Sequence, residues 1–192
     1  MNLRFKFLRM KTSPALYILL AFISTQIILS SCKKKAKESK LDVNYTTIDF
    51  DIPPSAAGTH TYLDLLVYTK IDSVMSANGF STSEITAAKL REAVLVIRNI
   101  NPPTAPNFDI ADKATLFIGT TSPASLKAAL LNSVPHTGLV EISMPGIDQD
   151  LDSYMKSASF FVSASVTTNA AIIDTVKMRL KLYFDVYAKQ QN

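Results

Sequence analysis

Three aspartates at alternate positions have a spacing that could hold a metal ion, in the segment Asp148-Gln149-Asp150-Leu151-Asp152. Such carboxylates begin the calcium loop of EF-hands, where oxygen atoms surround a hard cation. The rest of that loop is missing, because Ser153 stands where it needs glycine and Ser159 where it needs a bidentate acid. We therefore favour a short helix after Gly146 with an acidic first turn. Calcium at Asp148, Asp150 and Asp152 is the weaker alternative, and we expect no cofactor.

No other group of residues has the composition of a catalytic centre. His60 and His136 lie far apart in the sequence without further histidine or cysteine ligands beside them, whereas zinc needs three or four such ligands. We interpret both as surface or turn histidines. No serine stands in a G-x-S-x-G or S-x-x-K motif. The sequence therefore predicts a protein that is not an enzyme.

Two tyrosines near the C-terminus, Tyr183 and Tyr187, are the candidates for ligand binding. They fall on the polar side of an alternating segment, two positions either side of Asp185. Exposed tyrosines on a sheet can stack on sugars or anchor a protein partner. The alternative is packing against side chains of neighbouring strands.

The distribution of charge along the 192 residues argues against nucleic acid as a partner. The formal net charge is +4. Residues 1–32 contain four basic and no acidic residues, and residues 33–40 contain five basic residues and one acid. The remaining chain holds 11 basic and 15 acidic residues. Because the basic excess lies entirely in the first 40 residues, the acidic body lacks the basic surface that nucleic-acid binding requires.

The first 31 residues have the order of an export signal. Basic residues from Arg4 to Lys11 precede an apolar stretch from Ala15 to Leu29, which small residues follow. This stretch is shorter than the ~20 residues of a membrane-spanning helix. It ends in Leu29-Ser30-Ser31-Cys32, which contains the single cysteine of the chain.

This ending resembles the recognition box of the bacterial lipoprotein family. The resemblance implies cleavage before Cys32, lipidation of its thiol and attachment to a membrane through acyl chains. Lys33 in place of an aspartate after the cysteine implies the outer membrane, with its periplasmic or external face left open. An ordinary secretory signal or an uncleaved anchor is the alternative. Residues 33–40 are rich in lysine and predict a solvated tether, able also to touch anionic headgroups.

The body, residues 41–192, predicts an antiparallel β-sandwich of about seven strands with short helices in the connections. Apolar and polar residues alternate most clearly from Asp174 to Ala188 and again from Phe160 to Thr167. The segment from Leu90 to Ile100 is apolar on both faces and should be a central strand. Shorter strands are predicted for 46–52, 62–68, 114–119 and 139–143. One helix is predicted at 71–75, one helical turn after Ser81, and another helix through Leu126, Leu130 and Leu131.

These features together predict a lipid-anchored protein of the cell envelope with a non-catalytic binding or structural role. A glycan or an envelope protein would be its partner. The alternative is a lipoprotein that captures a glycan or small ligand beside an uptake system. A hydrolase whose residues form no recognisable motif is a third, weaker hypothesis.

Overall fold

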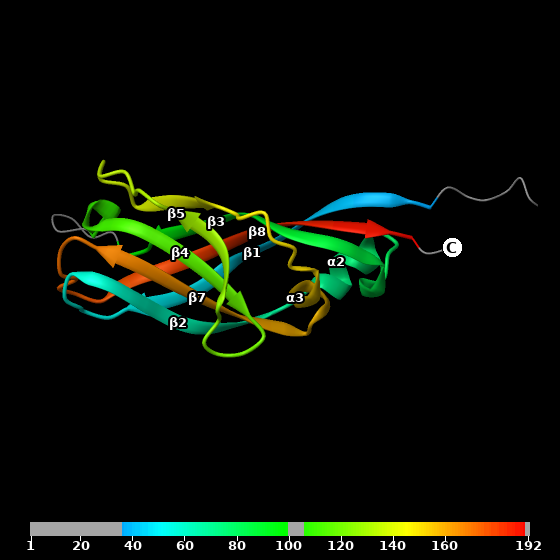
Figure 1. The fold of residues 1–192 in the computed structure, drawn as a ribbon, viewed down its shortest axis with the longest axis horizontal. Helices are drawn as coiled ribbons and strands as arrows, with labels where there is room; N and C mark the ends of the chain where they lie inside the picture. Colours follow the sequence, from blue (N-terminus) through cyan, green and yellow to red (C-terminus); the bar gives the residue numbers. More distant parts are fainter. Residues whose placement is uncertain (1–35, 100–105, 191–192) are drawn as a thin grey trace, which may run out of the picture. The chain divides into compact units, whose positions relative to one another are not determined.

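Two four-stranded antiparallel sheets make up the fold in a computed structural model, which describes residues 36–99 and 106–190 (Figure 1). The first sheet has the order β1 (Glu38–Ile52), β8 (Val176–Lys189), β3 (Ile85–Ile97) and β6 (Glu141–Pro145). The second has the order β2 (Gly58–Tyr68), β7 (Ser159–Thr168), β4 (Ala111–Gly119) and β5 (Leu126–Leu131). This arrangement confirms the predicted sandwich, with eight strands in place of about seven.

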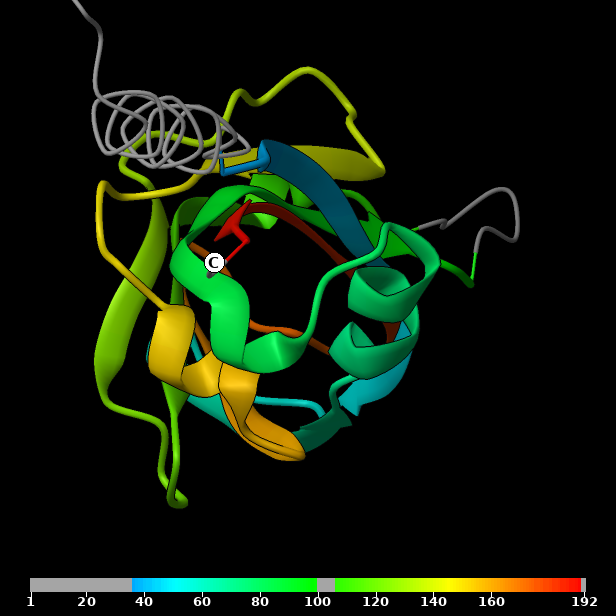
Figure 2. The same cartoon turned by 90° about the vertical axis from the view of Figure 1, so that its right-hand side faces the viewer.

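Short helices occupy the connections. They are α2 (Ile71–Ala77), α3 (Asp152–Lys156) and the 3₁₀ turns η1 (Thr82–Glu84) and η2 (Phe108–Ile110). The predicted turn after Ser81 is η1, and Ser81 and Glu84 form its capping box. Figure 2 shows α2 and α3 beside the end of the sandwich where the C-terminal strand finishes. No helix within the described ranges is long and apolar enough to span a bilayer.

The core lies between the sheets and follows the predicted alternation. Every second residue of β8 from Val176 to Ala188 is buried, and Leu182, Phe184 and Val186 have no exposed surface. Phe160 of β7 and Tyr45 of β1 pack edge-on against Phe184, with ring centroids 5.9 to 6.1 Å apart. Strand β3 lies between β8 and β6, which confirms that this doubly apolar segment is central.

Two local predictions were wrong. Leu126–Leu131 forms strand β5 and not a helix. It pairs with β4, and Ala128 and Ala129 are fully buried, so the hydrogen bonds and burial of the sheet outweigh a local helical preference. Strand β1 begins at Glu38, so the last three residues of the predicted tether belong to the sheet, where they pair with Tyr187, Ala188 and Lys189.

The two lateral sides of the sandwich differ. On one side β5 and β6 meet through a bridge between Ala129 and Gly146. Gly146 also lies tightly against β3 of its own sheet, because a Cβ atom there would stand 1.6 Å from the carbonyl oxygen of Leu90. On the other side β1 and β2 form no ladder. The sandwich is therefore closed along β5 and β6 and open along β1 and β2.

Candidate binding groove

A groove of about 490 Å³ lies on this open side, between β1 and β2. Both strands are irregular here, since the pairing of β1 with β8 shifts between Tyr45 and Ile48 and that of β2 with β7 between Tyr62 and Leu65. Such bulges bend a strand and change the direction of its side chains. The volume is in the range of small-molecule binding sites.

The walls of the groove carry hydrogen-bonding side chains that the protein itself leaves unused. Asn44, Thr46 and Thr47 come from β1, and Tyr68 and Lys70 come from the end of β2 and the residues after it. All five are exposed. Within residues 36–99 and 106–190, no hydrogen bond or ion pair involves the side chains of Asn44, Thr46, Thr47, Tyr68 or Lys70. These groups are available to a ligand.

Tyr45 lies between Asn44 and Thr46 in the β1 wall of the groove, and its ring packs against Phe160 and Phe184 in the core. Its side chain is 9% exposed, and its hydroxyl oxygen is buried without a hydrogen-bond partner among the described residues. Burial raises the pKa of the Tyr45 phenol, and the nearby backbone of Lys70 offsets this only in part. A buried hydroxyl left unpaired is costly.

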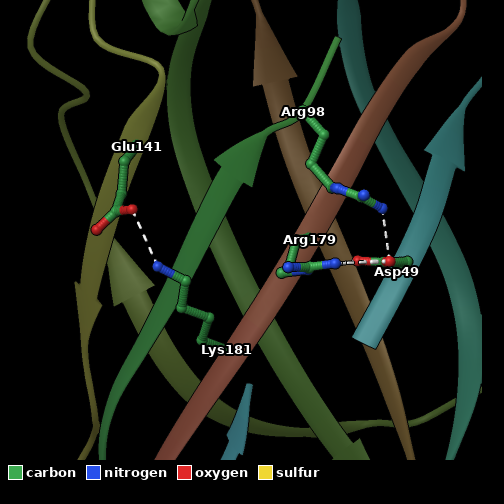
Figure 3. A network of polar contacts seen from close by, with 5 residues as sticks. All are labelled: Asp49, Arg98, Glu141, Arg179 and Lys181. Carbon is green, nitrogen blue, oxygen red and sulfur yellow. Dashed lines mark hydrogen bonds and ion pairs between the residues drawn. The ribbon is translucent and has the colours of Figure 1, made fainter. Parts of the chain in front are cut away.

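The carboxylate at the groove, that of Asp49, is paired with two arginines, Arg179 of the neighbouring strand β8 and Arg98 just after the end of β3 (Figure 3). Arg179 of β8 donates to both of its oxygens, at 2.7 and 2.9 Å, and Arg98 donates at 2.5 Å. The hydrogen bond from Arg179 is the main cause that lowers the pKa of Asp49. This cluster therefore carries a net positive charge beside the groove.

The outer face of the same sheet, which carries Tyr183 and Tyr187, is covered by ion pairs between strands. Lys181 contacts Glu141 at 3.1 Å (Figure 3), and Asp185 contacts both Lys40 and Arg91. Most charged side chains on this face therefore form ion pairs with one another, whereas the polar side chains of the groove named above form no such contacts among the described residues.

The structure places the predicted tyrosines within this charged face. Tyr183 is half-buried and lies opposite Asn44 of β1. Tyr187 is 37% exposed and lines a separate hollow of about 420 Å³ with Lys40 and Thr86. The two tyrosines share a face of β8, and Tyr183 is not among the residues that line the hollow at Tyr187.

The three aspartates of the calcium hypothesis turn to three different partners. Asp148 pairs with Lys89 at 2.5 Å, and Asp152 pairs with Lys156 at 2.7 Å. Asp150 accepts hydrogen bonds from the backbone N–H groups of Ala88 and Asp152. No group of three or more metal-ligating side chains occurs in the part of the chain that the structure describes. Helix α3 forms as expected but starts only at Asp152, with Leu151 and Met155 buried.

Asp64 and two serines form a cluster that holds the β4–β5 connection onto the second sheet. The hydroxyls of Ser122 and Ser163 donate to its carboxylate, as does the backbone N–H of Ala124 at 3.1 Å. These hydrogen bonds lower the pKa of Asp64, with that of Ser122 the largest cause. An ionised aspartate that only accepts hydrogen bonds has a structural role here.

The two histidines have local roles. The Nε2 atom of His60 lies 2.7 Å from the carbonyl oxygen of Ala56 in the preceding turn. That of His136 lies 3.2 Å from the carbonyl oxygen of Ala111 and 3.4 Å from the carboxylate of Asp112.

Sequence reasoning missed Tyr68 and Lys70, which the groove brings together with Asn44. In the sequence, the one indication of an exposed aromatic site here is that Tyr68 is the last residue of an alternating segment before a helix, with Leu66 on the same side. Asn44-Tyr45-Thr46 fits a glycosylation sequon, a pattern that does not indicate a groove. Cys32 and the rest of the predicted recognition box lie outside the described residues.

Comparisons with known proteins add little to this geometry. No protein-family model matches the chain, and no curated protein matches it. Among solved structures, the "Crystal structure of decameric BFDV Capsid Protein" is similar at 12% identity with a TM-score of 0.27, covering 79% of this chain and 99% of that one. A TM-score at this level carries no argument about this chain.

Proposed function

We propose that the protein is a lipoprotein of the cell envelope, anchored through acyl chains on Cys32, whose sandwich has a non-catalytic binding or structural role. The observation that carries the proposal is the sequence Leu29-Ser30-Ser31-Cys32 after a basic and apolar leader. Two or three acyl chains hold a protein stably on a bilayer, at ~0.8 kcal/mol for each buried methylene. The place of Lys33 favours the outer membrane.

The position of β1 supports a short attachment. Strand β1 begins at Glu38, six residues after Cys32, and six extended residues span at most about 20 Å. The start of β1 and the end of β8 pair with each other, so an anchor at Cys32 would hold this end of the sandwich near the bilayer. The loops at the opposite end would then point away from the membrane.

A second candidate function, capture of a glycan or small ligand, is favoured by the groove between β1 and β2. Its unpaired hydrogen-bonding side chains and its volume of about 490 Å³ are properties of a binding site. The two candidates share the anchor and differ in whether the sandwich binds a soluble ligand.

The anchor is tested by comparing the wild type with Cys32→Ala and with Ser31→Ala, which keeps a small residue before the cysteine. We expect wild type and Ser31→Ala in the outer-membrane fraction, with an N-terminal peptide whose mass includes acyl chains. Cys32→Ala should remain unprocessed or be released. Normal cleavage and full membrane retention of Cys32→Ala would refute the anchor. Protease treatment of intact cells then decides which membrane face the protein occupies.

A further inference from the structure

We propose that the groove between β1 and β2 binds an acidic oligosaccharide, a sugar chain that carries carboxylates. This inference rests on the proposed binding role of the sandwich but not on the lipid anchor. It identifies Tyr68 as the stacking residue, Lys70 as the partner of a carboxylate, and Asn44, Thr46 and Thr47 as partners of sugar hydroxyls.

Tyr68 offers the aromatic surface. It is 69% exposed, against 37% for Tyr187, and Leu66 two residues earlier is 43% exposed and lines the same groove. An amphipathic ring of this kind combines an apolar face with a hydroxyl that remains free to form a hydrogen bond. A sugar ring has the matching properties, with an apolar C–H face and polar edges.

The β1 wall supplies the polar contacts. Asn44, Thr46 and Thr47 are exposed on this wall and make no side-chain hydrogen bonds within the described ranges. Amide and hydroxyl groups both donate and accept hydrogen bonds, as sugar hydroxyls do.

The charges of the groove favour a carboxylate on the ligand. Lys70 is exposed and forms no ion pair in the part of the chain that the structure describes. The carboxylate of Asp49 is held by Arg98 and Arg179, so it does not oppose an incoming anion. A charge-assisted hydrogen bond from Lys70 to a carboxylate is stronger than one to a neutral hydroxyl.

The bulges argue against an extended peptide in the same groove. A peptide that adds a strand to a sheet needs a regular row of free backbone groups along the edge. Strands β1 and β2 are both bulged where they line the groove, and bulges interrupt such rows. Recognition at this place must therefore depend on side chains.

The test uses the full chain, purified in a polyoxyethylene detergent because sugar-based detergents would compete. The probes are an array of oligogalacturonates, oligomannuronates and hyaluronan fragments, each beside its methyl ester, which removes the charge and keeps the sugar. We expect retention of at least one acidic series over its ester. Titration calorimetry with that probe then compares wild type, Tyr68→Ala and Lys70→Gln with the matched controls Tyr187→Ala and Lys127→Gln.

Tyr68→Ala should weaken binding about ten-fold, the effect of losing one aromatic contact. Lys70→Gln should weaken binding of the acid but not of the ester, and the two controls should bind as wild type. The inference would be overturned if the protein retained none of the acidic probes, or if all four variants bound with the same affinity as wild type. The mass of the N-terminal peptide, measured on the same preparations, separates the two proposals. Acylated protein that binds no sugar would refute only the sugar site, and protein that binds sugar without being acylated would refute only the anchor.

Discussion

Replacing Leu182 by alanine tests the assignment of the core most directly. Leu182 is fully buried at the middle of β8, and its neighbours in the sheet are Tyr45 of β1 and Ala93 of β3. Removing a buried leucine side chain costs about 2–5 kcal/mol, depending on how far the surroundings close the cavity. Because β8 is held by strands on both sides, we expect limited closure and a cost of about 3 kcal/mol. For a domain of this size that lowers Tm by about 6–12 °C.

The measurement is urea denaturation of the full chain, followed by far-UV circular dichroism and by tyrosine fluorescence, since the chain has no Trp. The matched control is Lys177→Ala, on the exposed side of the same strand, which should change the free energy of unfolding by less than about 0.5 kcal/mol. A cost below about 0.5 kcal/mol for Leu182→Ala would refute the assignment of its face to the core.

Three further predictions follow from local geometry. Gly146→Ala should lower the free energy of unfolding by at least about 3 kcal/mol, because its Cβ would stand 1.6 Å from the Leu90 carbonyl oxygen. The control Gly138→Ala has open space and a φ of +72°, so it should lower that free energy only by the ~1–2 kcal/mol of left-handed strain. Similar denaturation midpoints for the two variants would contradict this. Asp64→Asn should destabilise the protein at pH 7 but less at pH 3. The hydrogen bonds that lower the pKa of Asp64 stabilise the fold above the ordinary aspartate pKa of about 3.9, and this stabilisation is lost as pH falls through the lowered pKa. A difference in urea midpoints that does not change with pH would disprove the prediction. Millimolar calcium or its chelation should leave Tm unchanged within about 1 °C, because Asp148, Asp150 and Asp152 have separate partners; a calcium-dependent rise would restore the metal hypothesis.

The strands could be predicted from the sequence wherever one face is buried and the other is exposed to solvent. The alternation of β8 identifies its inner face residue by residue, since neighbouring side chains point to opposite faces. This signal fails for β5, where Ala128 and Ala129 are both buried and the sequence resembles a helix. It also fails at the start of β1, where Glu38 and Lys40 are favourable in a strand only because Lys189 and Asp185 lie opposite or beside them.

The groove was not predictable, because it depends on which strands are edges and on where they bulge. Tyr183 and Tyr187 have the same alternating pattern as an exposed binding face, yet ion pairs between strands surround them. Tyr68 and Asn44 are separated in the sequence and lie on different sheets. Only the pairing order, with β1 and β2 both outermost, brings them to one side of the sandwich.

If the chain is exported as proposed, the order of the strands affects when the sandwich can form. Among the described strands, β1 pairs only with β8 and β2 pairs only with β7. Both of these early strands therefore lack a sheet partner until β7 and β8 have emerged. Such long-range pairing delays folding relative to the synthesis of the chain. Under the proposed export, neither sheet could therefore be completed before β7 and β8 had crossed the membrane. Attachment of lipid at Cys32, under the proposed anchoring, would then come before the sandwich closes, while the leader is still accessible to processing enzymes.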